Sequence, residues 1–297
     1  MAKKSIKKGR SSSKKNSLHS AKGGSKRAGR QNKQGIFYKA WVWVGGIGVI
    51  AAVLFFVRPF QSADEAPVLR PNIVGTFPHD TTAFTQGLLI EQGKLYESTG
   101  QYGESTVRRI DLRTGQTMQE HKLDEAFFGE GLAALDGRLY QLTWKEGTCF
   151  VYDLESFAPL DTLAIPAKEG WGLTEDGSHL IMSDGSSLLR YLDPGTLEIV
   201  REVEVRNGGR ALSRLNELEY IEGLIYANVW QSGYIAVIDP VDGAVQQLLD
   251  LSWFSMVHGI DGADVLNGIA YEPSTQRLLV TGKNWPEYYV LELPSID

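Results

Sequence analysis

Cysteine is almost absent from this chain. Cys149 is the only one among 297 residues, so no disulfide can form within the chain. A domain of this sequence placed outside the cytoplasm, where disulfides persist, must therefore depend on its hydrophobic core. Cys149 stands in a strand-like stretch without a histidine in register, and we interpret it as a core residue and not as a nucleophile.

Several sequence patterns of common catalytic sites are also missing. The five histidines, at positions 19, 79, 121, 179 and 258, do not have the spacing of metal ligands. No G-x-S-x-G segment is present, which excludes a nucleophile elbow. The turn Asn207-Gly208-Gly209 is not followed by the Lys-Ser/Thr pair of a phosphate-binding loop. We therefore expect neither a metal nor a cofactor.

Acidic residues are missing from the N-terminal segment. The first 36 residues contain twelve Lys or Arg and no Asp or Glu, and Ser and Gly fill most of the rest. Such a segment cannot bury enough apolar surface to fold alone, so residues 1–36 are predicted to be a disordered basic tail. Beyond Arg58 the balance reverses, because 16 Lys and Arg face 36 Asp and Glu, a net charge of about −20. This charge argues against nucleic acid as a partner of the folded part.

An apolar run follows the basic tail. The 18 residues from Ala40 to Val57 carry no charge and lie between Lys39 and Arg58. With the aromatic residues before it, the run predicts a transmembrane signal-anchor helix over residues 37–57, followed by a linker over 58–71. The excess of Lys and Arg on the N-terminal side predicts a cytoplasmic tail. We therefore expect a single-pass membrane protein whose remaining residues lie on the extracytoplasmic side, in a periplasm or outside the cell.

A cleaved signal peptide is the alternative interpretation of this region. Its basic segment would be unusually long, and so would its apolar core. The nearest candidate cleavage site, Gln61-Ser62-Ala63, has glutamine where a small residue is required. These features favour an anchor that is not cleaved.

A short sequence phrase returns five times in the rest of the chain, each time before a turn and a second hydrophobic segment. The copies are Gly87-Leu88, Gly131-Leu132, Gly172-Leu173, Glu217-Leu218 and Gly268-Ile269. The hydrophobic residue recurs at intervals of 44, 41, 45 and 51 positions. A period of this length with several short strands per unit is typical of β-propellers. We therefore predict an all-β fold, a five-bladed β-propeller over residues 72–297, preceded by the single transmembrane helix.

The last repeat stops soon after its third strand, so one outer strand is missing. We expect Asn72–Phe77, at the start of the domain, to supply this strand and to close the ring of blades.

The repeat register also predicts which residues face one another. The residue before each inner strand lies at one mouth of the central channel, and in register these residues are Gln86, Glu130, Trp171, Asn216 and Asn267. The ends of the second strands return to the same face and supply Gln101, Trp144, Asp184, Trp230 and Lys283 with Trp285. A concave apolar pocket with a few convergent polar groups is the usual form of a binding site. The alternative is that these aromatic residues only pack between blades.

Glu130 is the most informative residue at this mouth. It lies between Gly129 and Gly131, which we interpret as allowing the backbone to approach a ligand closely. A carboxylate surrounded by aromatic side chains should have a raised pKa, as a general acid and base requires. Glu130 could instead accept hydrogen bonds from backbone amides or hold an ion in the channel.

The segments that carry these residues resemble a known family. They are Phe84-Thr85-Gln86-Gly87-Leu88, Phe127-Phe128-Gly129-Glu130-Gly131-Leu132, Gly170-Trp171-Gly172-Leu173, Leu215-Asn216-Glu217-Leu218, Asn228-Val229-Trp230-Gln231 and Gly282-Lys283-Asn284-Trp285. In order and over the whole predicted propeller, they are similar to those of the plant and bacterial glutaminyl-peptide cyclotransferases. The predicted anchor lies outside this resemblance.

The resemblance implies a five-bladed propeller that acts on peptides or proteins with an N-terminal glutamine, converting it to pyroglutamate with release of ammonia. It implies that Glu130 is the catalytic acid and base. It also implies a substrate pocket formed by Phe84, Gln86, Phe128, Trp144, Trp171, Asn216, Trp230 and Lys283. The reaction passes through an oxyanion, which N–H donors of Trp or Asn side chains could bind. We expect the protein to be a monomer.

Two other functions stay open at this point. A Ca²⁺-dependent lactonase-like propeller also places Glu and Asn side chains at a channel mouth, although the aromatic positions here leave few oxygen ligands for Ca²⁺. A propeller that only displays binding surfaces would not require a glutamate among tryptophans.

Overall fold

The computed structural model describes residues 64–254 and 265–292, all of which belong to the folding unit Phe60–Asp297. The predicted basic tail (1–36) and signal-anchor helix (37–57) lie outside the described residues. Within the described ranges no helix is long and apolar enough to cross a membrane.

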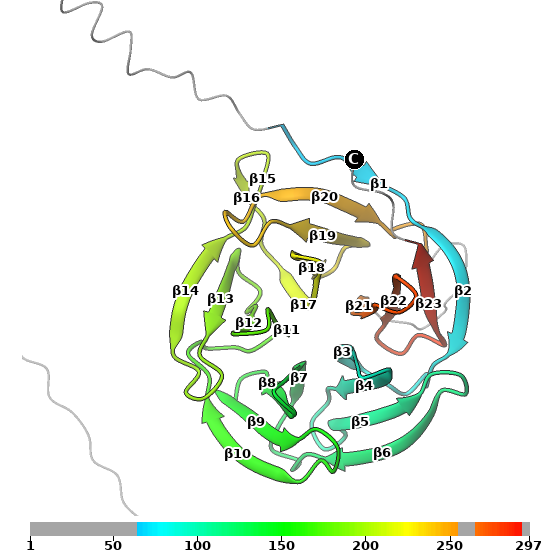
Figure 1. Cartoon of the computed structure of the whole chain (residues 1–297), viewed down its shortest axis with the longest axis vertical. Helices are drawn as coiled ribbons and strands as arrows, with labels where there is room; N and C mark the ends of the chain where they lie inside the picture. Colours follow the sequence, from blue (N-terminus) through cyan, green and yellow to red (C-terminus); the bar gives the residue numbers. More distant parts are fainter. Residues whose placement is uncertain (1–63, 255–264, 293–297) are drawn as a thin grey trace, which may run out of the picture. The chain divides into compact units, whose positions relative to one another are not determined.

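Five sheets of at least four strands surround a common centre (Figure 1). The first blade consists of β3 (Thr85–Glu91), β4 (Lys94–Thr99), β5 (Thr106–Asp111) and β6 (Gln116–Lys122). The second consists of β7 (Gly129–Leu135), β8 (Arg138–Thr143), β9 (Thr148–Asp153) and β10 (Pro159–Ala164). The third consists of β11 (Leu173–Glu175), β12 (Leu180–Met182), β13 (Leu188–Leu192) and β14 (Ile199–Glu204).

The fourth blade consists of β17 (Leu215–Ile221), β18 (Leu224–Val229), β19 (Tyr234–Ile238) and β20 (Val245–Asp250). The fifth consists of β21 (Leu266–Glu272), β22 (Arg277–Gly282), β23 (Glu287–Glu292) and β2 (Asn72–Pro78). A small hairpin of β15 (Arg206–Asn207) and β16 (Arg210–Ala211) lies in the connection from the third blade to the fourth. The predicted five-bladed propeller is therefore confirmed.

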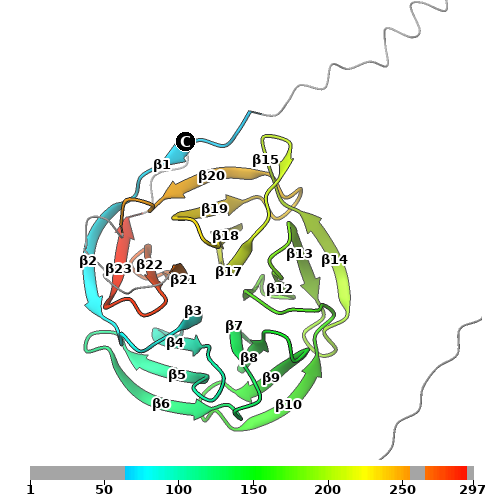
Figure 2. The same ribbon diagram turned by 180° about the vertical axis from the view of Figure 1, so that it is seen from behind.

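The fifth blade closes the ring in the predicted way. Its outer strand, β2, comes from the start of the domain and pairs antiparallel with β23, with Asn72 opposite Glu292 and Phe77 opposite Tyr288. Seen from behind, β2 runs along the outside of β23 (Figure 2). The prediction that Asn72–Phe77 supplies the missing strand is confirmed.

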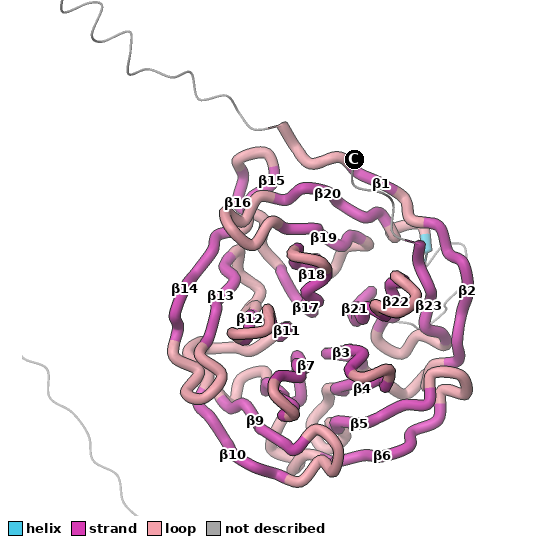
Figure 3. The backbone as a smooth tube through the Cα atoms, in the orientation of Figure 1, coloured by secondary structure: helices cyan, strands magenta, loops and turns pink. Residues whose placement is uncertain are grey.

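The segment before β2 is also attached to the propeller. Strand β1 (Val68–Leu69) pairs parallel with β20, the outer strand of the fourth blade (Figure 3). The backbone N–H of Ala66 donates to Oδ1 of Asn207 over 2.7 Å. The C-terminal part of the predicted linker (58–71) thus lies against the fourth blade as a fifth strand.

The hydrophobic core lies between neighbouring blades. Each of five clusters of buried residues combines side chains from two adjacent blades. Cys149, for example, is fully buried between the second and third blades among Leu142, Leu173 and Met182, which confirms its interpretation as a core residue. Leu88 of the first blade packs in the cluster shared with the fifth, so the apolar packing continues around the whole ring.

The inner strands carry the side chains that face the channel mouth. The pairing register of β3, β7, β17 and β21 with the next strand shifts at the positions of Gln86, Glu130, Asn216 and Asn267 respectively. Such bulges redirect side chains at the end of a strand.

Glu217 replaces the repeated glycine in the fourth repeat. Its buried Oε1 accepts the backbone N–H of Leu88, so this side chain connects the fourth blade to the first. Burial raises the pKa of the Glu217 carboxyl well above its ordinary value.

Candidate active site

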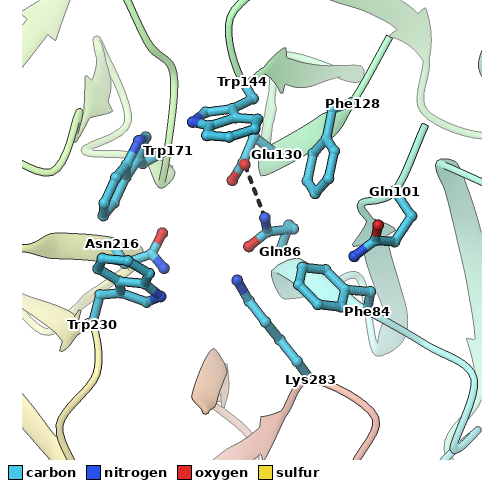
Figure 4. A pocket seen from close by; sticks show the side chains of 10 residues that line it. All are labelled: Phe84, Gln86, Gln101, Phe128, Glu130, Trp144, Trp171, Asn216, Trp230 and Lys283. Carbon is cyan, nitrogen blue, oxygen red and sulfur yellow. Dashed lines mark hydrogen bonds between the residues drawn. The ribbon is translucent and has the colours of Figure 1, made fainter. Parts of the chain in front are cut away.

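A pocket of about 270 Å³ brings the predicted site residues together (Figure 4). Its lining consists of Phe84, Gln86, Gln101, Phe128, Glu130, Trp144, Trp171, Asn216, Trp230 and Lys283. All nine residues predicted from the sequence are among them. Gln101, which follows β4, is the tenth; its register position pointed to this face, but it was not included in the predicted site.

The pocket residues lie at the beginning of the inner strands or just after the second strands. Gln86, Glu130 and Asn216 lie on the inner strands β3, β7 and β17. Phe84, Phe128 and Trp171 come just before inner strands. Others follow the second strands, as Trp144, Trp230 and Lys283 follow β8, β18 and β22. The repeat therefore places side chains of different chemistry around one cavity.

Three residues of the predicted mouth do not line the pocket. Asp184 pairs with Arg190 of its own blade. Asn267 lies behind Gln86, with its Nδ2 donating to Oε1 of Gln86 over 3.2 Å.

The prediction that Trp285 faces the mouth of the channel is wrong. A Cβ atom on Gly282 would lie only 2.3 Å from the ring of Trp285, so the ring folds back over that glycine. It stacks in the buried core on Phe254, with ring centroids 5.4 Å apart. Because Gly282 has no side chain, this fold of the loop is sterically possible.

Glu130 is a buried carboxyl group on the pocket floor. The residue is only 4% exposed. Its Oε1 accepts a hydrogen bond from Nε2 of Gln86 over 2.8 Å. Burial raises the pKa of Glu130 well above its ordinary value; the charge of Lys283 lowers it, and the charges of Glu146 and Glu169 raise it further. The carboxyl group can therefore exchange a proton nearer to neutral pH than an exposed glutamate can.

Gly131, next to Glu130, has a role in packing between blades. A Cβ atom on Gly131 would lie 2.5 Å from the backbone nitrogen of Leu173 and 2.5 Å from the backbone oxygen of Trp171. The N–H of Gly131 donates to this oxygen over 2.6 Å. Gly131 thus allows the backbones of the second and third blades to touch.

Aromatic rings form most of the pocket wall. Phe84 and Phe128 meet edge to face with centroids 6.0 Å apart, and Trp171 and Trp230 do so at 5.4 Å. Phe128 also lies 5.6 Å from Trp144. Nζ of Lys283 lies 4.5 Å from the centroid of the Phe84 ring, an arrangement that favours the ammonium ion.

Two of the tryptophan N–H groups do not face the cavity. Nε1 of Trp144 and Nε1 of Trp171 both donate to Oε2 of Glu169, over 2.9 Å and 3.0 Å. An indole has one N–H donor, so these two are engaged by protein. The expectation that tryptophan N–H groups could bind an oxyanion therefore does not apply to Trp144 or Trp171. Glu169 was not recognised from the sequence, since it lies outside the repeated phrase.

The described residues contain no group of three or more His, Cys, Asp or Glu side chains arranged to hold a metal ion. The polar side chains that line the pocket, apart from the tryptophans, are one carboxyl, three amides and one ammonium. This set suits proton transfer and the binding of a polar, uncharged side chain.

Comparison with known proteins points to one family. The sequence profile of the family described as glutamine cyclotransferase matches residues 48–293. The chain is 44% identical over 255 residues to a glutaminyl-peptide cyclotransferase of Arabidopsis thaliana, covering 82% of this chain and 80% of the relative. It is also similar to the crystal structure of Myxococcus xanthus glutaminyl cyclase. That match has a TM-score of 0.72 and 37% identity, and covers 78% of this chain and 100% of the other.

Proposed function

The chain belongs to the glutamine cyclotransferase family and has glutaminyl-peptide cyclotransferase activity, which forms pyroglutamate, and we propose that Glu130 transfers the proton in this reaction. The observation that carries the proposal is the buried position of this carboxyl group in a pocket walled by aromatic rings. The substrates are peptides or proteins with an N-terminal glutamine.

The reaction needs one proton to move from one nitrogen to another. The α-amine must lose a proton to attack Cδ of its own side chain, and the amide nitrogen must gain one to leave as ammonia. In our proposal, Glu130 accepts the first proton and returns it to the leaving nitrogen. One C–N bond forms, another breaks, and the carboxyl group returns to its starting state. The raised pKa of Glu130 suits both steps because it brings the affinity for the proton closer to that of the amine.

The intermediate carries a negative oxygen that needs a positive or N–H group nearby. Figure 4 shows the ammonium end of Lys283 and the indole nitrogen of Trp230 on the side of the pocket opposite Phe128, with the Asn216 amide next to them. We assign oxyanion stabilisation to these three residues. Trp144 and Trp171 are not part of the set because their N–H groups bind Glu169.

The remaining pocket residues hold the substrate in the reactive conformation. The aromatic walls limit the space for the glutamine side chain, so it folds back towards its own α-amine. This intramolecular approach accelerates the attack without a covalent enzyme intermediate. Gln86 is fixed between Glu130 and Asn267 by hydrogen bonds, and it presents a rigid polar surface to the substrate amide.

Ammonia release from a peptide that begins with glutamine tests this proposal. The wild-type protein should release ammonia, and a Glu130→Gln variant should turn over at least about a hundredfold more slowly, the usual lower contribution of an acid–base group. The variant retains the shape of the side chain and should still bind the peptide. An intact fold, checked by circular dichroism, makes the comparison valid. A near-wild-type rate would remove Glu130 from the mechanism.

We also propose where this reaction takes place. The uncharged run Ala40–Val57 and the basic residues before it support an N-terminal membrane anchor with the tail in the cytoplasm. The propeller then lies on the extracytoplasmic side, in a periplasm or outside the cell, and acts as a monomer on peptides there.

A further inference from the structure

We propose that Glu169 is a positioning residue that fixes the orientation of Trp144 and Trp171 in the substrate pocket. This inference rests on the proposed function, because it concerns how the same pocket binds its substrate. Glu169 does not itself line the cavity.

The geometry around Glu169 is that of one acceptor with two donors. Oε2 of Glu169 lies 2.9 Å from Nε1 of Trp144 and 3.0 Å from Nε1 of Trp171. Trp144 belongs to the second blade, and Trp171 precedes β11 of the third. Figure 4 shows the nitrogen-bearing edges of the two indoles close to one another. A single carboxylate oxygen therefore joins two pocket walls from neighbouring blades.

The backbone holds Glu169 in place for this contact. The N–H of the next residue, Gly170, donates to the backbone oxygen of Trp144 over 2.9 Å. The N–H of Trp171 donates to the backbone oxygen of Ser183. The loop that carries Glu169 is thus attached both to the end of β8 and to the third blade, so the carboxylate has a defined position relative to both rings.

These hydrogen bonds decide which surface the rings show to the substrate. With both N–H groups bound by Glu169, each ring turns its carbon atoms towards the cavity. The resulting wall suits the methylene groups of a glutamine side chain and offers no competing donor to its amide. Hydrogen bonds to a charged acceptor are about twice as strong as neutral ones, which suits a contact that must hold two rings.

The ion pair of Glu169 does not explain its position. Nζ of Lys145 lies 3.9 Å from Oε1, with side chains 51% and 35% exposed, and pairs of this kind contribute little to stability. Lys145 also lies over the Trp144 ring, 3.5 Å from its centroid, and so supports that ring from the side. Lys145 therefore contacts both Glu169 and Trp144, the residue of the pocket wall that Glu169 binds.

The charge of Glu169 also acts on Glu130. Burial is the main cause of the raised pKa of Glu130, and the negative charges of Glu146 and Glu169 raise it further. Removing the charge should lower this pKa, whereas removing the hydrogen bonds should loosen the wall. The two effects can be separated because glutamine retains an acceptor oxygen but has no charge.

The test measures kcat and KM of the full-length protein with a glutamine-initiated peptide. Glu169→Ala should raise KM by about tenfold, the effect expected for losing hydrogen bonds to a charged group. Glu169→Gln should restore KM to within about threefold of wild type, because its amide oxygen still accepts from the indoles. In both variants the acid limb of kcat/KM should move to lower pH. Glu155→Gln, a matched change at an exposed ion pair with Lys94, should alter neither quantity.

A double-mutant cycle with Trp144→Phe tests the contact itself. Phenylalanine lacks the N–H, so Trp144→Phe should raise KM in the wild type but add little in the Glu169→Ala background. If the increases in KM of the two single variants simply add in the double variant, the proposal is wrong. A wild-type KM for Glu169→Ala would also overturn it, and so would a KM of Glu169→Gln as high as that of Glu169→Ala. If Glu169→Ala does not fold, Trp144→Phe in the otherwise wild-type protein decides, because a wild-type KM for that variant would contradict the contact. A wild-type protein that releases no ammonia would instead contradict the proposed function, so the two failures are distinct.

Discussion

Gln86 donates its Nε2–H to Oε1 of Glu130 over 2.8 Å, so the carboxyl of the active site is held by a neutral amide. A neutral donor orients the carboxyl group without the large stabilisation of its charged form that a direct ion pair gives. Glu97, another buried glutamate, shows the contrast, since its Oε2 is bound by Arg108 over 2.9 Å and its pKa is held well below the ordinary value. One propeller therefore contains a carboxyl suited to exchange protons and one that stays ionised.

The pH dependence of kcat/KM should reflect this difference. Glu130 must be unprotonated to accept the proton of the α-amine, so kcat/KM rises as pH increases through its pKa. Because that pKa is raised, the acid limb should lie above about 4.3, the ordinary value for glutamate. Lys283→Met removes the positive charge that lowers this pKa, so the limb should move to higher pH. A pH–rate profile that shows no shift, or a shift in the other direction, would contradict the assigned electrostatics.

Removal of an aromatic wall should affect binding more than chemistry. Trp230→Ala deletes a ring that packs edge to face on Trp171 and lines the pocket. We expect KM to rise by about tenfold or more, since aromatic contacts contribute both buried area and specific geometry. The value of kcat should fall less than KM rises, unlike the effect of Glu130→Gln. Steady-state kinetics of both variants with one peptide give this comparison, and an unchanged KM would exclude Trp230 from the binding wall.

The Glu97 ion pair predicts how the fold responds to a substitution and to acid. Arg108→Met would leave a buried carboxylate without its cation, which typically costs about 3–5 kcal/mol. The melting temperature at pH 7 should therefore fall sharply, while Arg113→Met, at an exposed position, should have little effect.

The ion pair of Glu97 and Arg108 also predicts how the stability of the fold changes with pH. Burial alone would raise the pKa of Glu97, but the charges of Arg108 and His79 and the hydrogen bonds of His79 and Thr85 hold it well below the ordinary value. Its stabilisation is present above the pKa of the unfolded chain, about 4.3, and is lost as pH falls towards the folded pKa. Wild type should lose stability over this range, and Arg108→Met should lose less there. Thermal unfolding at several pH values measures both.

The membrane topology can be tested with fusions after Asp297. If the anchor is oriented as proposed, a reporter that is active only outside the cytoplasm should be active at this position. A reporter that requires the cytoplasm should be inactive. The opposite pattern would reverse the proposed orientation. Removing the Lys and Arg residues of the tail should weaken the preference, since they set the orientation.

The repeated phrase was enough to predict the ring of blades and most of the pocket. It places equivalent backbone positions on one face, so Glu130 and Asn216 could be assigned to the same mouth. It does not determine which way a side chain turns after its strand has ended. Trp285 shows this limit, because its ring folds over Gly282 into the core instead of facing the mouth.

The supporting carboxylates could not be predicted for another reason. Glu169 accepts hydrogen bonds from two indoles that come from different blades and lie close together only in the folded protein. Glu97 likewise accepts a hydrogen bond from Tyr288 of the fifth blade, 191 positions further along the chain. In the sequence such residues look like ordinary acidic residues, because these contacts between blades exist only in the folded ring.

Ring closure by β2 and β23 has a consequence for the order of events during biosynthesis. The hydroxyl of Thr76 on β2 donates to Oε1 of Glu287 on β23, across 211 positions of the chain. The fifth blade therefore cannot be completed until β23 has been translated. Until then β2 has no partner strand, and the apolar surfaces of the first and fourth blades that face the fifth remain uncovered. Nascent chains should thus need protection from aggregation until β23 has been made, and truncations that remove β23 should be degraded and not merely less active.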